Sequence, residues 1–188
     1  MTSARIVADT LVYDGWYKLR RLCVRMPCGT EVERHVEEHG DAAAVLPYDP
    51  ERRMALVISL PRAPILATGE PPILEAIAGN LEGRPPEDCA RIEALEEGGV
   101  RLNGLEPVGR VWTMPALSTE RLHLFIGHYS TKDRIGSGGG LAAEAENIVV
   151  KEITLAALSR DLLANHYSDP KLIMLAQALL LRRPNLLS

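Results

Sequence analysis

Disulfide bonds, membrane spans and a nucleic-acid footprint all lack support in this 188-residue sequence. It contains only three cysteines, Cys23, Cys28 and Cys89, with no CxxC spacing, which argues against a disulfide framework or a zinc site and predicts buried free thiols. No apolar run approaches the roughly 18 residues that a spanning helix needs. The net charge of −4 disfavours tight binding to long nucleic acids. We therefore expect neither a membrane nor a nucleic-acid partner, whereas a small anionic ligand is compatible with the composition.

The remaining composition is that of an ordinary globular protein. Apolar residues make up 46% and charged residues 24% of the chain, near the averages for folded domains. The first residues, Met1 to Arg5, lack the basic start and apolar core of a signal peptide. We therefore expect a globular cytoplasmic protein.

The N-terminal part of the chain reads as antiparallel strands. Residues 6–13 and 16–26 are rich in β-branched and aromatic side chains, and turn signals at Asp14-Gly15 and Pro27-Cys28-Gly29 follow them. The sequence His35 to His39 fits an inverted zinc-protease motif, but it is too short and too strand-like to form the helix that this motif needs. We assign residues 1–41 to an N-terminal β segment and residues 42–188 to the main domain.

The main domain alternates between strands and helices. Apolar runs at 42–48 and 54–60 flank a turn and predict a buried hairpin. The glycine-rich stretch within 130–145 has no following Lys-Ser/Thr, so we interpret it as a mobile loop and not as a phosphate cradle. Further strands are expected at 73–78, 106–114, 121–129 and 148–153, and helices at 85–98, 155–165 and 170–183.

Three glutamates on the first of these helices are the strongest functional signal. Glu93, Glu96 and Glu97 are three and four positions apart and therefore share one helical face. A solvated acidic face is the ordinary explanation, but Ile92 and Leu95 provide an apolar stripe that we expect to pack the helix down. Clustered carboxylates then suit Mg²⁺ or Mn²⁺.

The stretch around these glutamates resembles the Nudix box, G-x5-E-x7-R-E-U-x-E-E-x-G-U, in which U is apolar. Five positions in its second half match: Glu93, Glu96, Glu97, Gly99 and Val100. The first half departs from the pattern, because the spacing from Gly79 to Glu93 is one residue short, Arg84 stands at the first glutamate position and Ile92 replaces the arginine. These departures bear on the geometry of the loop more than on metal binding.

The resemblance extends over nearly the whole chain, to the ADP-ribose and GDP-mannose pyrophosphatases and in particular to the GDP-mannose branch. It implies an α+β fold, a Nudix α/β/α sandwich with a mixed central sheet, and an N-terminal antiparallel β segment used in homodimerisation. It also implies hydrolysis of a nucleoside diphosphate sugar to a nucleoside monophosphate and a sugar phosphate, with Mg²⁺ or Mn²⁺ as cofactor. The alternative that we retain is a catalytically weak or inactive Nudix module that binds a nucleotide sugar as a sensor.

The resemblance also assigns roles to individual residues. The implied metal ligands are the Ala78 carbonyl, Glu93, Glu96, Glu97 and Glu146. The implied catalytic residues are Glu146 as base, with Glu144 as its alternative, and Glu96 through a second ion. The implied substrate contacts are Trp16, Arg34, Arg62, Gly79, Glu120 and Lys171, of which Trp16 stacks on the base across a dimer.

Overall fold

A computed structural model describes residues 3–141 and 146–186. Within them the chain forms two compact units. The smaller unit contains residues 3–41 together with Val111–Leu122, and the larger contains Ala42–Arg110 and the residues from His123 onward. A later segment of the chain therefore joins the N-terminal strands.

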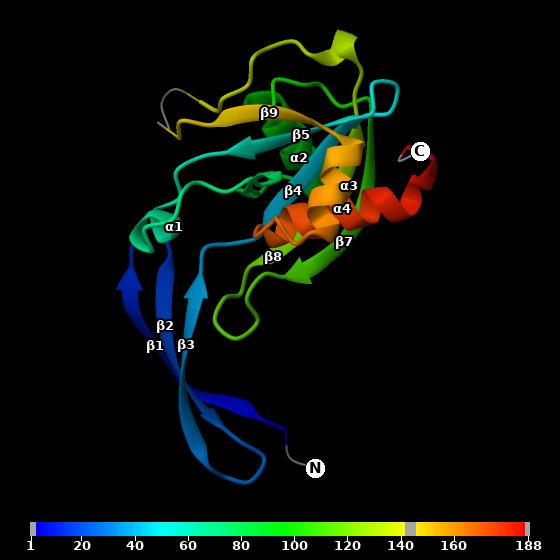
Figure 1. Ribbon diagram of the computed structural model, residues 1–188. Helices are drawn as coiled ribbons and strands as arrows, with labels where there is room; N and C mark the ends of the chain where they lie inside the picture. The colour runs from blue at the N-terminus through cyan, green and yellow to red at the C-terminus, as the bar shows by residue number, and fades with distance from the viewer. Residues whose placement is uncertain (1–2, 142–145, 187–188) are drawn as a thin grey trace. The chain divides into compact units, whose positions relative to one another are not determined.

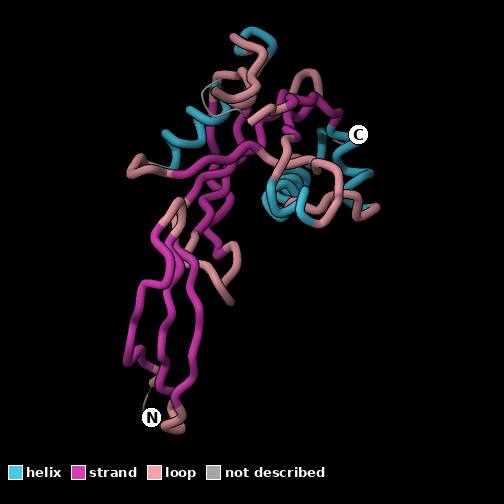
Figure 2. Tube along the Cα trace, turned by 90° about the vertical axis from the view of Figure 1, so that its left-hand side faces the viewer, coloured by secondary structure: helices cyan, strands magenta, loops and turns pink. Residues whose placement is uncertain are grey.

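The smaller unit is built on a three-stranded antiparallel sheet. Its strands are β1 (Arg5–Asp14), β2 (Lys18–Arg25) and β3 (Glu31–Glu38), in the order β1-β2-β3, and they lie side by side in Figure 2. Gly29, with a φ of +91°, completes the second turn, as the sequence predicted. The prediction of strands is confirmed, but Trp16 lies in the first turn because β2 begins only at Lys18.

The larger sheet has six strands in a mixed arrangement, ordered β7-β8-β4-β5-β9, with β6 paired to β4. The pairs β4-β5, β4-β6 and β5-β9 are antiparallel, and the predicted hairpin at residues 42–60 is confirmed. The strands are β4 (Ala42–Asp49), β5 (Met54–Ser59), β6 (Ile77–Asn80), β7 (Gly104–Trp112), β8 (Arg121–His128) and β9 (Val149–Thr154).

Four α-helices accompany this sheet: α1 (Ala63–Ala67), α2 (Pro86–Glu96), α3 (Leu155–Leu163) and α4 (Pro170–Arg182). The three longer helices were predicted. Proline in the first turn of α2 and α4 suits a helix start, because proline lacks a backbone N–H and the N–H groups of a first turn have no partner within the helix. The five-residue helix α1 was missed, because it is too short to show a helical period. Two 3-10 turns, Thr131–Asp133 and Pro184–Leu186, complete the described elements.

The central strands β4 and β5 of the larger sheet are buried on both faces, with α2 on one side of the sheet and α3 with α4 on the other (Figure 1). Successive side chains of a strand point to opposite faces. Ala43 and Val45 of β4 pack in one cluster with Ala90 and Ala94 of α2. The alternate residues of β4 are equally buried, and Leu155, Leu158, Leu172, Leu175 and Leu179 of α3 and α4 are buried as well. This layering is the predicted α/β/α sandwich.

The structure corrects two of the predicted packing roles. Helix α2 buries Cys89, Ala90 and Ala94, whereas Leu95 is 40% exposed, so the expected Ile92 and Leu95 stripe is wrong. Small side chains on the buried face allow α2 to approach the sheet closely. Of the three cysteines, which are all free, only Cys89 is buried. The prediction fails for Cys28, which is exposed in the turn between β2 and β3.

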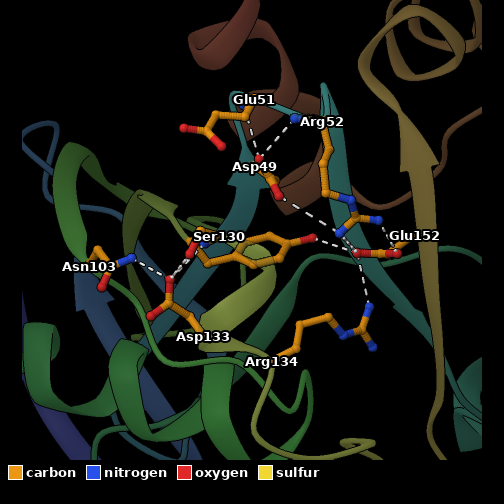
Figure 3. Close-up of polar contacts among 9 residues, drawn as sticks. Asp49, Glu51, Arg52, Asn103, Ser130, Asp133, Arg134 and Glu152 are labelled. Carbon is orange, nitrogen blue, oxygen red and sulfur yellow. Dashed lines mark hydrogen bonds and ion pairs between the residues drawn. The ribbon is translucent and has the colours of Figure 1, made fainter.

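A charged network ties the β4-β5 hairpin to β9 (Figure 3). The Asp49 carboxylate accepts hydrogen bonds from the N–H groups of Glu51 and Arg52, both at 3.0 Å. The Arg52 guanidinium pairs with Glu152 through bonds of 2.9 and 2.8 Å. Hydrogen bonds from Arg52, and also from the Tyr129 hydroxyl, lower the pKa of Glu152 to about 2. The Arg52–Glu152 pair therefore remains ionised and joins the β4-β5 hairpin to β9.

In the part of the chain that the structure describes, no helix is both long enough and apolar enough to cross a membrane.

The N-caps of α3 and α4 provide a test of how the helices are anchored. Asp169 is 2% exposed, and its carboxylate accepts hydrogen bonds from Lys171 N, Leu172 N and the distant Ala76 N. We expect Asp169→Ala to lower the free energy of unfolding by about 3 kcal/mol, because it removes a cap and strands a buried N–H. Thr154→Ala, at the exposed cap of α3, should cost about 1 kcal/mol. Equal losses in urea denaturation would contradict this assignment.

Candidate active site

The centre of the candidate site is the contact between strand β6 and the end of helix α2. The Ala78 N–H donates a hydrogen bond of 3.2 Å to the Glu97 carboxylate. One residue further on, a Cβ placed on Gly79 would lie 2.0 Å from Oε1 of Glu93. Only glycine therefore lets the Glu93 side chain lie against the β6 backbone. The predicted Ala78, Gly79, Glu93 and Glu97 are thus brought together.

Glu97 is a buried carboxylate among other carboxylates. Glu97 is only 4% exposed. Burial first, and then repulsion from Glu93 and Glu146, raise the pKa of Glu97 to about 8, against the opposing effects of the Ala78 N–H and of Arg62. Hard oxygen donors that repel one another in a buried place suit a divalent cation, which would relieve both the burial and the repulsion. The residues at this site therefore fit Mg²⁺ or Mn²⁺.

The carboxylates do not form a complete ligand set by themselves. Among residues 3–141 and 146–186, no group of three or more His, Cys, Asp or Glu side chains is arranged to hold a metal ion. Mg²⁺ is commonly held by one or two carboxylates, with waters and substrate phosphates completing its shell. A pair of glutamates beside the Ala78 backbone is compatible with that mode. The metal ligands remain predictions.

The glycine-rich segment is bonded to the end of α2. Gly139 N donates to the Glu97 carbonyl at 2.9 Å, and Gly140 N donates to the Glu96 carbonyl at 3.1 Å. Gly138 has a φ of +68°, and a Cβ there would lie 2.2 Å from the Glu97 carbonyl oxygen. These glycines, in the segment for which the sequence predicts a mobile loop, therefore allow a close approach to the acidic helix.

The same segment leads towards the predicted base. A Cβ on Gly140 would lie 3.0 Å from Oε2 of Glu146, so the glycine run and this carboxylate are in contact. The repulsion between Glu146 and Glu97 places the two carboxylates in one electrostatic cluster. Glu144, the alternative base, lies outside the described residues. Glu96 is bonded to this segment through its backbone carbonyl.

Arg62 and Lys171, the two cations predicted to contact the diphosphate or the sugar, share one carboxylate that was not among the predicted site residues. Arg62 and Lys171 both bond to Glu75, and Lys171 also pairs with Asp169. Arg62 feels the negative charges of Glu97 and Glu146 as well. The sequence signal for Asp169 was available, since Asp followed by Pro marks a helix start. Nothing in the local pattern identified Glu75.

Three of the predicted substrate contacts, Trp16, Arg34 and Glu120, belong to the smaller unit. Trp16 is 78% exposed and stacks on His39, with ring centroids 5.3 Å apart and an interplanar angle of 23°. Oε1 of Glu120 lies 4.0 Å from Nε2 of His39. The exposed Arg34 guanidinium donates a hydrogen bond to the Glu33 carbonyl. The stacking of His39 on Trp16 is not evident from the sequence, in which His39 belongs only to the protease-like motif. Substrate contacts by Trp16, Arg34 and Glu120 stay predictions.

Comparison with known proteins decides the family. No family model matches the chain. A GDP-mannose pyrophosphatase of Cronobacter sakazakii is 33% identical over 186 residues, covering 96% of each chain. The GDP-mannose pyrophosphatase of Pectobacterium atrosepticum is 32% identical over 183 residues, covering 94% of each chain. The protein belongs to the GDP-mannose pyrophosphatase family.

The fold of this family member is supported independently by a solved structure. The crystal structure of an ADP compounds hydrolase matches 97% of this chain and 97% of its own, with a TM-score of 0.72 at 16% sequence identity. The predicted α+β Nudix fold is thereby confirmed. Nudix hydrolases generally use a divalent metal, in agreement with the oxygen donors gathered around Glu97.

Because Glu97 is buried, we expect the free energy of unfolding of this protein to depend on pH. The carboxyl pKa is about 8 in the folded state against an ordinary value of 4.5. Without divalent metal, the stability that Glu97 contributes is therefore complete below pH 4.5 and is lost as the pH rises towards 8. Glu97→Gln should be more stable than the wild type at pH 8.5 by about 3 kcal/mol, with the difference vanishing near pH 4.

Urea denaturation in EDTA across this pH range measures the effect. Glu87→Gln, at an exposed position on the first turn of the same helix, is the matched control and should show no such pH-dependent gain. A constant difference between Glu97→Gln and the wild type would contradict the burial of an unneutralised carboxylate.

Proposed function

We propose that this protein hydrolyses the diphosphate bond of a nucleoside diphosphate sugar of the GDP-mannose or ADP-ribose type. The products are a nucleoside monophosphate and a sugar phosphate. The observation that carries the proposal is the buried Glu97 carboxylate bonded to β6. It is supported by relatives named GDP-mannose pyrophosphatases, which match this chain over almost their full length. Three free cysteines, one of them exposed, fit a reducing compartment such as the cytoplasm.

The cofactor in this proposal is Mg²⁺, with Mn²⁺ as the alternative. Glu93, Glu97 and the Ala78 carbonyl would hold it, and Glu96 would assist a second ion. The chemistry that the bound cation supplies is neutralisation of diphosphate oxygens and acidification of a water molecule. Glu93 and Glu97 supply the carboxylates for this cation at the end of α2. The N–H groups of Gly139 and Gly140 bond to backbone carbonyls at the same helix end.

The chain itself handles the proton and the charge of the substrate. The Glu146 carboxylate accepts the proton of the attacking water, whose oxygen forms a new bond to one phosphorus atom. The bond from that phosphorus to the bridging oxygen breaks, and its electron pair leaves with the second phosphate. Arg62 and Lys171 neutralise the phosphate oxygens, and the bare Gly79 backbone leaves room beside Glu93. Glu144 is the second candidate for the base.

Base recognition and dimer formation complete the proposal. Trp16 would stack on the base across a homodimer, with Arg34 and Glu120 as polar contacts. Support comes from strand β1, where apolar side chains are exposed on an edge of a three-stranded sheet. Such an edge commonly pairs with another chain. Its exposed apolar residues are Ile6, Val7, Leu11, Val12 and Tyr13.

A substrate panel tests the activity. With Mg²⁺, we expect turnover of GDP-mannose or ADP-ribose in preference to UDP-glucose, measured as nucleoside monophosphate released. Glu93→Gln and Glu97→Gln should each lower kcat/KM by at least about 100-fold, because each removes a charged oxygen ligand. Glu87→Gln on the same helix should retain wild-type turnover. Absence of hydrolysis with the whole panel, or unchanged rates in both glutamine variants, would sink the enzyme proposal and favour a binding protein.

The dimer has a separate test. Light scattering at micromolar concentration should give twice the mass of the chain. Val12→Lys, on the exposed strand β1, should shift the protein towards the monomer without unfolding it, because a buried unpaired charge opposes strand pairing. A wild-type monomer under these conditions would exclude the role of Trp16 across subunits.

A further inference from the structure

Glu75 bridges Arg62 and Lys171, the two cations to which the proposed function assigns the phosphate contacts. Arg62 binds it with two parallel bonds, Nε to Oε1 at 3.0 Å and Nη2 to Oε2 at 3.1 Å. Lys171 Nζ donates to the same Oε2 at 3.2 Å. The three residues are far apart in sequence and come from the N-cap of α1, the segment before β6 and the first turn of α4. One carboxylate therefore fixes two cations from different elements.

The bridge is stable only as a unit, because Glu75 is 4% exposed. Burial opposes its charge, but the bonds from Arg62 and the charge of Lys171 outweigh burial and hold the pKa of Glu75 below its ordinary value. Removing one partner of a buried pair leaves an uncompensated charge, which costs more than the pair contributes. The positions of the two cations are thus coupled.

Asp169 connects this bridge to the strand of the candidate metal site. Its Oδ1 accepts from Lys171 Nζ at 2.8 Å, and its Oδ2 accepts from Ala76 N at 2.9 Å. Two residues after Ala76, the Ala78 N–H is bonded to Glu97. The Cα atoms of Glu75 and Ala78 can be at most about 11 Å apart, because three residues of extended chain span no more. Glu75, Ala76 and Ala78, which bond to the two cations, to Asp169 and to Glu97 respectively, therefore belong to one short segment.

Arg62 is bonded to Glu75 and also interacts electrostatically with the acidic cluster. Its bonds to Glu75 use Nε and Nη2, which leaves Nη1 outside that pair. The negative charges of Glu97 and Glu146 also act on the guanidinium, so Arg62 and the acidic cluster are electrostatically coupled. A planar guanidinium whose inner edge is fixed by a carboxylate is preorganised to offer its outer edge to a phosphate.

We propose that Glu75 is a positioning residue for diphosphate binding, which holds Arg62 and Lys171 together as one preorganised anion-binding unit. The proposal rests on the proposed function only in taking these two cations as the phosphate contacts. Glu75 itself touches no phosphate, since it is negatively charged and acts through its two partners. Without it, the cations lose their fixed spacing, and binding must then supply the cost of ordering two long side chains.

Two measurements test this role. Calorimetry with methylenediphosphonate, a diphosphate that cannot be hydrolysed, is carried out with Mg²⁺ and reports binding without turnover. Glu75→Gln should raise its Kd about tenfold, and Glu75→Asp should recover part of the loss by restoring the charge. With the preferred nucleotide sugar, Glu75→Gln should raise KM by a similar factor while kcat changes less than about threefold.

Glu152→Gln is the matched control, because Glu152 also accepts bonds from arginine side chains but lies in the hairpin network of Figure 3. This variant should lose stability and keep the wild-type Kd for methylenediphosphonate. Wild-type affinity in a folded Glu75→Gln protein would overturn the proposal, as would an equal loss in Glu152→Gln. If the wild type binds methylenediphosphonate and hydrolyses no substrate, the proposed function fails while the positioning role stands.

If Glu75→Gln does not fold, the coupling can be measured from the two partners. Arg62→Gln and Lys171→Gln are both at least partly exposed positions and can be combined. If Glu75 couples the cations, the double variant should raise the Kd for methylenediphosphonate several-fold less than the product of the two single increases. Strictly multiplicative increases would show two independent contacts and contradict the bridge.

Discussion

The bond from the Ala78 N–H to the buried Glu97 carboxylate is the interaction on which the rest of the site depends. It joins the last turn of α2 to strand β6, and it is possible only because Cys89, Ala90 and Ala94 let the helix approach the sheet. Gly79 then leaves space for Glu93, and the glycine segment closes over the helix end. Small residues thus create a buried place for carboxylates that would otherwise repel one another.

This arrangement trades stability for function. Ionising the buried Glu97 carboxyl lowers the free energy of unfolding of the metal-free protein, and a bound divalent cation would offset that loss. The ion pairs around Glu75 show the opposite case, in which two cations neutralise a buried acid and leave it ionised. One short segment holds both acids, because Glu75 lies three residues before Ala78, whose N–H bonds to Glu97.

Much of the fold could be predicted from the sequence, because strands and helices with clear periods are local properties. Proline at the starts of α2 and α4 and Gly29 in its turn marked boundaries correctly. The exposed Leu95 and the anchored glycine segment were not predictable, since they depend on which helical face meets the sheet. Glu75 was missed for the same reason: its partners Arg62 and Lys171 are distant in sequence and meet only after folding.

The central claim is that Glu97, with Glu93 and the Ala78 carbonyl, holds the divalent cation proposed for this member of the GDP-mannose pyrophosphatase family. Equilibrium binding of Mn²⁺, followed by electron paramagnetic resonance, tests it most directly, because free and bound Mn²⁺ give different signals. The wild type should bind Mn²⁺ saturably, and Glu97→Gln should weaken that binding at least about tenfold, since one charged ligand is lost. Equal Mn²⁺ binding by the two proteins would place the cation elsewhere and contradict this account.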